Sequence, residues 1–202
     1  MKKAITFFVA LLLLVTLSCK KDKKESDNST ETSVETIDSS IETGDDSASE
    51  NDSKKLTVKL EPRSDSKVSG NVVFQQKSGV VTMVAIIGGL SEGPHAIHLH
   101  EKSDCSSPDG KSTGGHWNPT AKPHGKWGAA EGFHKGDIGN FTADANGNGT
   151  ITFITSEWCI GCEDPTKDIL GKAIIVHQGT DDFTSQPSGA AGSRISCGAV
   201  IE

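Results

Sequence analysis

Long apolar runs, clustered positive charge and helical periodicity are all scarce in this sequence of 202 residues. The apolar run from Ile5 to Leu17 is shorter than the roughly 20 residues that a membrane-spanning helix needs. No basic patch argues for nucleic acid, and no segment convincingly repeats its apolar residues every 3.6 positions. The sequence therefore argues against a spanning helix, a nucleic-acid partner and a helical fold.

The N-terminus has the layout of a secretory signal peptide, which we expect to span residues 1–18. Lys2 and Lys3 precede the apolar run, and the small residue Ser18 stands before Cys19. Cys19 resembles the acylated cysteine of bacterial lipoproteins. We expect an exported protein whose membrane contact is a lipid anchor at Cys19, facing the periplasm or the cell exterior. A soluble secreted protein cut nearby is the alternative.

Residues 19–53 have the composition of a disordered acidic tether. After four lysines, Ser, Thr, Asp, Glu and Asn dominate, and too few apolar residues are present to offset the entropy of ordering. Residues 20–53 hold 11 acidic and 4 basic residues, whereas residues 54–202 hold 16 acidic and 14 basic ones. The acidity of the chain therefore belongs to the tether and says little about the ligands of the domain.

Residues 54–202 form the predicted folded domain and have an all-β pattern. Apolar and polar side chains alternate over residues 56–60, with the period of a half-buried strand. Further β-branched segments follow at regular spacing, separated by turns rich in glycine and serine. These segments favour an antiparallel sandwich or barrel, with predicted strands at residues 56–60, 72–74, 80–87, 139–143 and 150–154.

The turn at residues 144–149 has two interpretations. Asp144, Asn146 and Asn148 fit the first half of an EF-hand calcium loop, but Thr155 stands where the bidentate Glu is expected. Asn-Gly between two strands is a strong hairpin signal on its own. We therefore predict a hairpin.

The histidines indicate a transition-metal site, because six of the seven fall within residues 93–137. His98 and His100 are two residues apart on a predicted strand, so both rings leave one face while Ile97 and Leu99 point into the core. Two imidazoles from one strand supply half of the tetragonal site that copper(II) prefers.

A long stretch rich in Gly, Pro, Ser and Lys follows, at residues 104–132, and such a loop within a compact domain is usually functional. Together with the residues just after it, the loop supplies three histidines and one aspartate. This donor set suits a closed zinc site, formed by His116, His124, His134 and Asp137.

Several separated blocks along the chain form a recognisable series: Gly93–Glu101, Gly115–Pro119, His124-Gly125, His134–Gly139, Val176-His177 and Gly192–Gly198. In order and in spacing, these blocks closely resemble the copper,zinc superoxide dismutase family. The match runs from about Leu56 to Ile201. It implies a Greek-key antiparallel β-sandwich or flattened barrel with long metal-binding loops.

The resemblance also implies the cofactors and the reaction. A redox-cycling copper would dismute superoxide to oxygen and hydrogen peroxide, and a structural zinc would share the imidazolate of His116 with it. The alternative is a dismutase-like domain that stores or delivers copper and zinc without turnover. By position in the family motifs, the copper ligands are His98, His100, His116 and His177, and the zinc ligands are His116, His124, His134 and Asp137.

Further roles follow from the same resemblance. Arg194 matches the arginine that guides the anion to copper, and Asp181 matches the carboxylate that ties a copper-ligand histidine to a zinc-ligand histidine. His95 matches a histidine that hydrogen-bonds backbone beneath the site. The family disulfide corresponds to Cys105 and Cys197.

Two features depart from the better-known family members. Cys159 and Cys162 form an additional C-x-x-C, for which we expect a local disulfide in a surface loop rather than thioredoxin-like chemistry. The loop between His177 and Arg194 is short and lacks the usual cluster of steering charges. Electrostatic steering of the substrate is then weaker, or it depends on lysines such as Lys122, Lys126 and Lys135. The sequence does not distinguish a monomer from a homodimer.

Overall fold

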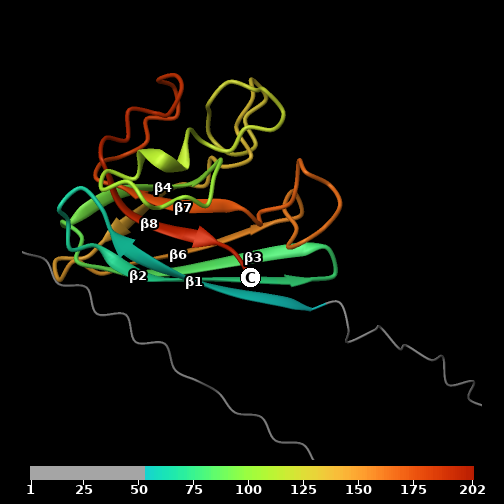
Figure 1. Cartoon of the computed structure of the whole chain (residues 1–202). Coiled ribbons are helices and arrows are strands. Elements are labelled where there is room, and N and C mark those ends of the chain that lie inside the picture. Colours follow the sequence, from blue (N-terminus) through green and yellow to red (C-terminus); the bar gives the residue numbers. More distant parts are fainter. Residues whose placement is uncertain (1–52) are drawn as a thin grey trace, which may run out of the picture. The chain divides into compact units, whose positions relative to one another are not determined.

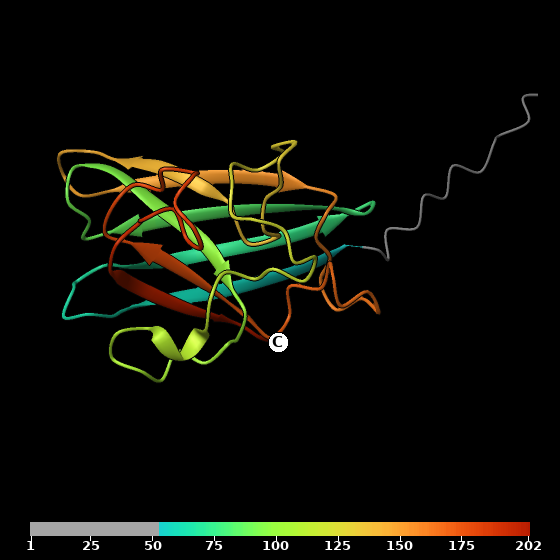
Figure 2. The same cartoon turned by 90° about the horizontal axis from the view of Figure 1, so that it is seen from above.

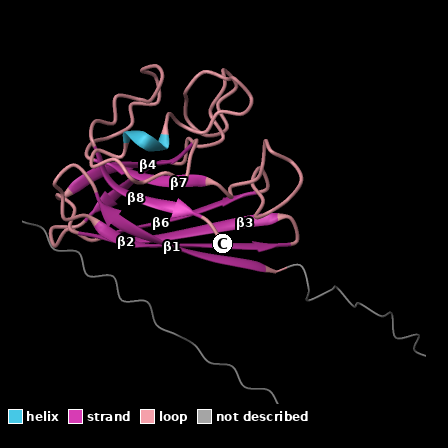
Figure 3. Ribbon diagram, viewed as in Figure 1, coloured by secondary structure: helices cyan, strands magenta, loops and turns pink. Residues whose placement is uncertain are grey.

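The computed structural model describes residues 53–202, which fold into one closed antiparallel β-barrel (Figures 1 and 3). The predicted signal peptide, Cys19 and the tether up to residue 52 lie outside the described residues. Among those described, no helix is long and apolar enough to cross a membrane. The strands are β1 (Lys54–Pro62), β2 (Ser69–Lys77), β3 (Val80–Gly88), β4 (Gly93–His100), β5 (Gly139–Ala143), β6 (Gly149–Thr155), β7 (Lys172–His177) and β8 (Arg194–Val200), with a short 3-10 helix at Lys111–Thr113.

The strands follow the order β1-β2-β3-β6-β5-β4-β7-β8 around the barrel. The first three form a meander, but β3 pairs with β6 and β4 pairs with β7, so the chain crosses the end of the barrel twice. This is Greek-key connectivity, and it confirms the predicted all-β fold. Every predicted strand is present, and most extend one or more residues beyond their predicted ends.

Alternation of burial explains how β1 and β3 form the wall of the barrel. Val58 and Leu60 of β1 are buried and Lys59 between them is exposed. In β3 the inward side chains of Val81 and Met83 are fully buried. Each such side chain contributes about 1.5–3 kcal/mol by leaving water, so the registers of these strands are fixed by their apolar faces.

Strands β4 and β7 are buried on both faces, unlike β1 and β3. Residues 95–100 of β4 and 173–177 of β7 are all buried. Figures 1 and 2 show the reason: the long loops after β4 and after β7 lie over the outer side of these two strands. On this side of the barrel the outer face of the strands is therefore shielded from solvent by the loops, and the histidines lie between the two.

The turn between β5 and β6 is a hairpin, as predicted. Ala143 pairs with Gly149 across it, and the backbone N–H of Asp144 donates to the carbonyl of Asn148 at 2.8 Å. The Asp144 carboxylate accepts hydrogen bonds from the backbone N–H groups of Asn146 and Asn148, each at 2.9 Å. Its oxygen thus caps the turn itself, as Asx turns do.

Candidate metal centre

Two adjacent strands position three of the histidines. His98 and His100 leave the outer face of β4, while Ile97 and Leu99 are fully buried in the barrel core, as predicted. The ladder between β4 and β7 pairs His98 with Ile175, and His177 follows two residues later at an irregularity in the β7–β8 ladder. The ring of His177 therefore lies beside that of His98, with centroids 4.9 Å apart.

His116 comes from the loop but is fixed to the same strand. An isolated bridge pairs it with His100, and the N–H of the following residue, Trp117, donates to the carbonyl of Leu99 at 2.8 Å. Gly136 completes the arrangement, because its N–H donates to Trp117 and a Cβ there would lie 2.2 Å from the carbonyl oxygen of Leu99. The centroids of the rings of His98 and His116 are 4.0 Å apart.

A second group gathers around the carboxylate of Asp137. Nδ1 of His116 lies 2.8 Å from Oδ1 of Asp137, and Nδ1 of His134 lies 3.2 Å from the same oxygen. Nδ1 of His124 lies 3.0 Å from Oδ2. Backbone N–H groups of Gly125 and His134 also donate to Oδ2, so the carboxylate is held firmly although it is buried.

Each group can hold one metal ion. Within each group of four, the donor atoms lie within 4.8 Å of one another, and His116 belongs to both. Six buried ring nitrogens make no well-aligned hydrogen bond, although two of them, on His124 and His134, lie beside the carboxylate of Asp137. Such burial is costly unless a ligand satisfies these nitrogens. The residues therefore fit two metal ions; the nitrogens are Nδ1 of His98, His124 and His134, and Nε2 of His100, His116 and His177.

Asp181 connects the two groups. Its Oδ2 lies 2.9 Å from Nε2 of His98 and its Oδ1 lies 2.9 Å from Nε2 of His124. Contacts of this kind fix the tautomer and orientation of ligating histidines. They leave Nδ1 of each ring free to face its group.

Gln186 holds the backbone of His124 in addition. Its side-chain Oε1 accepts from the N–H of His124 and its Nε2 donates to the carbonyl of His124, both at 2.9 Å. The loop at residues 178–193 therefore holds the ring of His124 through Asp181 and its backbone through Gln186. Gly189 makes this possible, because a Cβ there would lie 1.8 Å from Oδ1 of Asp181.

Three histidines, His100, His116 and His177, stay neutral. Burial, and then the neighbouring imidazoles, hold the pKa values of His100 and His177 well below the usual range. Burial also lowers the pKa of His116 to about 4, although Asp137 opposes the shift. Neutral imidazoles are the form that binds transition metals.

The histidine between the two carboxylates behaves differently. Burial acts to lower the pKa of His124, but contacts with Asp137 and Asp181 outweigh it and raise that pKa to about 9. Burial acts to raise the pKa values of Asp137 and Asp181, but hydrogen bonds with the histidines hold both well below the usual range. A cation is therefore favoured at this position.

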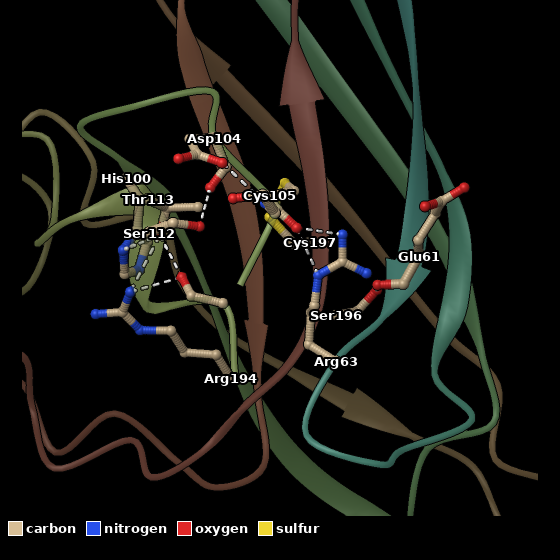
Figure 4. Close-up of a disulfide and its surroundings, with 12 residues drawn as sticks. Glu61, Arg63, His100, Asp104, Cys105, Ser112, Thr113, Arg194, Ser196 and Cys197 are labelled. Carbon is tan, nitrogen blue, oxygen red and sulfur yellow. Dashed lines mark hydrogen bonds between the residues drawn. A yellow bond between two sulfur atoms is a disulfide. The ribbon is translucent and has the colours of Figure 1, made fainter. Parts of the chain in front are cut away.

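Figure 4 shows how Arg194 is held at the edge of the first group. Its Nη1 donates to the carbonyl of Gly110 at 2.9 Å and to Oγ1 of Thr113 at 3.0 Å, and Thr113 in turn lies 3.3 Å from Nδ1 of His100. The loop that carries Gly110 is tied to β8 by the disulfide between Cys105 and Cys197. The pairing implied by the resemblance is thus present.

A cavity of about 450 Å³ opens onto this edge. His100, His116, His177 and Arg194 line it, together with Lys111. Lys122, Lys126 and Lys135, which the sequence offered as steering charges, do not line it. Lys135 instead pairs with the carboxylate of Glu157.

The remaining sequence predictions concern His95 and the C-x-x-C. His95 is buried, its Nδ1 lies 2.9 Å from the carbonyl oxygen of His177 and its Nε2 lies 2.9 Å from that of Ser91, so it supports the backbone beneath the site. Cys159 and Cys162 form the expected local disulfide, in the loop after β6.

Sequence reasoning missed Gln186, Thr113 and Lys111. Gln186 lies in an irregular loop, and Thr113 and Lys111 lie in a short 3-10 helix. The contacts of Gln186 and Thr113 are with residues distant in the sequence, and Lys111 lines the cavity. The glycines beside Thr113, at positions 110 and 114, were the only available signal, since both adopt positive φ in a tight turn.

Comparisons with known proteins agree with this geometry. The family described as "Copper/zinc superoxide dismutase (SODC)" matches residues 68–200. Superoxide dismutase (Cu-Zn) 2 of Aquifex aeolicus is 34% identical over 132 residues, covering 63% of this chain and 75% of the relative. Superoxide dismutase (Cu-Zn) of Schizosaccharomyces pombe is 37% identical over 147 residues, covering 68% of this chain and 92% of the relative.

Solved structures with the same fold include a double mutant of a SOD-like protein from Bacillus subtilis. It is 30% identical, with a TM-score of 0.65, and the match covers 72% of this chain and 97% of that chain. The similarity therefore includes the barrel and the loops over it.

Proposed function

This chain belongs to the copper/zinc superoxide dismutase family, and from that premise we propose which of its residues carry the reaction. The protein is an oxidoreductase that dismutes superoxide to oxygen and hydrogen peroxide, with copper and zinc as its cofactors. Bound copper supplies the one-electron chemistry of both half-reactions. The shared position of His116 in two complete ligand groups is the observation that carries the assignment.

We assign copper to the group at the cavity. Its four unpartnered nitrogens are all imidazole, as copper(II) prefers, and the low pKa values of His100, His116 and His177 keep those rings unprotonated. The donors are Nδ1 of His98 and Nε2 of His100, His116 and His177.

We assign zinc to the group around Asp137. Three imidazoles and a carboxylate form a closed four-donor set, which is typical of a structural zinc site. The donors are Nδ1 of His116, His124 and His134 and a carboxylate oxygen of Asp137. His116 would then offer one ring nitrogen to each ion, and its contact with Asp137 holds the ring in position.

The residues at the cavity handle the anion and the proton. The guanidinium of Arg194 is half-buried and fixed by Gly110 and Thr113, so it presents a positive charge beside the copper ligands without reorganising. Such a charge attracts superoxide into the cavity and holds it there. When it is not bound to copper, Nε2 of His116 would be the ring atom that accepts a proton and returns it to the departing peroxide.

Metal analysis and a dismutase assay test the proposal together. Purified protein loaded with copper and zinc is expected to hold one of each per chain and to dismute superoxide. Tight binding of both metals without turnover would favour the storage or delivery alternative.

We also propose that the protein is a bacterial lipoprotein, exported and anchored through Cys19. The proposal is supported by the basic residues, apolar run and small residue that precede Cys19. In cells fed a fatty-acid analogue, the wild-type protein is expected to incorporate label and to remain with membranes, whereas Cys19→Ser is not. Protease access to intact cells then separates surface display from the periplasm, and sedimentation of purified protein tests for a homodimer.

A further inference from the structure

The two disulfides of the described domain differ in what they hold together. Cys105 and Cys197 are 92 positions apart, whereas Cys159 and Cys162 are 3 apart. A disulfide stabilises the folded state more when it closes a longer loop, and a more stabilising disulfide is harder to reduce. The sulfur of Cys162 is also reachable, since its contact with the carbonyl of Asp164, at 3.7 Å, is solvent-exposed.

The residue before Cys159 contacts the segment that joins two of the zinc ligands. The indole Nε1 of Trp158 donates to the carbonyl of Lys135 at 2.8 Å, and Lys135 stands between His134 and Asp137. Trp158 is 1% exposed and packs against the rings of neighbouring aromatic residues, including Trp127 at 5.9 Å between centroids. The side chain therefore fixes the peptide that joins two of the zinc ligands.

The turn closed by the Cys159–Cys162 disulfide is hydrogen-bonded to the barrel. Lys54 of β1 donates through Nζ to the carbonyls of Ile160 and Gly161, at 2.7 and 3.1 Å. Gln76 of β2 accepts from the N–H of Ile160 at 2.7 Å. The closed turn thus connects the first two strands to Trp158, and through Trp158 to the zinc loop.

We propose that the Cys159–Cys162 disulfide is a reversible redox site that controls how firmly the protein retains zinc. A dithiol reductant attacks Sγ of Cys162, and Cys159 leaves as a thiol. The resulting mixed disulfide is resolved by the second thiol of the reductant, which becomes a disulfide while the protein gains two thiols. Hydrogen peroxide, the product of the protein's own reaction, reverses the change: two thiols and one peroxide give the disulfide and two waters.

Opening the turn frees the backbone that positions Trp158. The hydrogen bond from Trp158 to Lys135 is then made by a less constrained segment, and the peptide between His134 and Asp137 is held less firmly. Zinc leaves faster, while the copper ligands of β4 and β7 are unaffected. This consequence rests on the proposed zinc site.

The order of reduction tests the first half of the proposal. The metal-loaded protein is treated with increasing dithiothreitol, trapped with N-ethylmaleimide and mapped by mass spectrometry. We expect Cys159 and Cys162 to be labelled while Cys105 and Cys197 remain joined, and peroxide to abolish the labelling. Equal or earlier reduction of Cys105–Cys197 would overturn the proposal.

Zinc release tests the second half without any reductant. Cys159→Ser/Cys162→Ser is expected to release zinc to a chromogenic chelator on the order of tenfold faster than wild type, with copper release unchanged. Trp158→Phe keeps the disulfide but removes the donor to Lys135, and it should change zinc release in the same direction. Glu163→Gln, which alters the same turn but neither sulfur, is the matched control and should match wild type.

The outcomes separate the two hypotheses. Wild-type protein that binds no zinc would contradict the proposed function. Zinc that binds normally but leaves the double variant and Trp158→Phe at the wild-type rate would contradict only the redox proposal. If the double variant does not fold, zinc release from Trp158→Phe and the order of disulfide reduction still test the redox proposal.

Discussion

The two ligand groups that share His116 are built in different ways. The copper group takes His98 and His100 from β4 and His177 from β7, two strands joined by a hydrogen-bonded ladder. The zinc group takes His124, His134 and Asp137 from the loop between β4 and β5, which has no ladder of its own. The barrel positions one set of donors, and side-chain contacts position the other.

The difference predicts where the site is fragile. Ladder hydrogen bonds hold the copper donors whether or not a metal is bound. The zinc donors depend on Asp137, on Asp181 and Gln186 from the next loop, and on Trp158 from a third. Changes to these contacts should affect zinc first and copper second.

The largest effect is expected at the residue common to both groups. His116→Ala removes one nitrogen from each ion, so dismutase activity should fall at least about a hundredfold and both metals should bind more weakly. His134→Ala, which removes a donor from zinc alone, is the control and should retain copper. Near-normal activity of His116→Ala would contradict the shared ring.

The two ligand groups should also differ in how their metal affinity depends on pH. Zinc must displace the proton of His124, whose pKa is raised to about 9, so its apparent affinity should fall about tenfold per unit as the pH drops from 8 to 6. His100, His116 and His177 are already neutral in that range, so copper affinity should change less. Chelator competition on metal-free protein measures both slopes, and equal slopes would contradict the account.

The same pKa shift has a consequence for the stability of the metal-free fold. A raised pKa means that protonated His124 stabilises the folded state fully below its unfolded pKa of about 6.5, and that this contribution is lost as the pH rises through about 9. Denaturant unfolding of metal-free protein across this range should show the decline.

Asp181 tests the link between the groups. Asp181→Asn removes an acceptor shared by His98 and His124, so zinc affinity should fall about 10–100-fold, and copper affinity by less. Gly189→Ala should have a similar effect without altering the carboxylate, because its Cβ would displace Asp181. Asp182→Asn changes the neighbouring exposed acid and should leave both affinities near wild type.

The smallest effect is expected at Gln186. Gln186→Leu removes both hydrogen bonds to the peptide of His124, so zinc affinity should fall severalfold. In cobalt-substituted protein, the visible bands of the ion at the zinc position should shift as the ligand geometry changes. Gln178→Leu alters an exposed amide of the same loop and should leave the bands unchanged. Identical spectra for both variants would contradict a role for Gln186 in positioning His124.

Much of this arrangement could be read from the sequence because it is local or periodic. The strands follow from alternation, as in residues 56–60, and the pair His98 and His100 shares a face because strands have a period of 2. The donor chemistry of the long loop predicted His116, His124, His134 and Asp137 as a zinc site. The role of His177 as a copper ligand and the disulfide to Cys197 came from the family resemblance.

The contacts between loops could not be predicted in the same way. Gln186 lies 62 positions from His124, and Trp158 lies 23 positions from Lys135. No periodicity relates such pairs, because irregular loops have no repeating geometry. The burial of β4 and β7 on both faces was missed for the same reason, since it depends on where those loops lie.

A crystal structure of the protein loaded with copper and zinc, with anomalous data collected at both metal edges, would show whether the two ions share the ring of His116. We expect copper at Nε2 of His116 and zinc at Nδ1 of the same ring. A structure in which His116 binds only one ion, or in which copper lies away from His98, His100 and His177, would contradict this expectation.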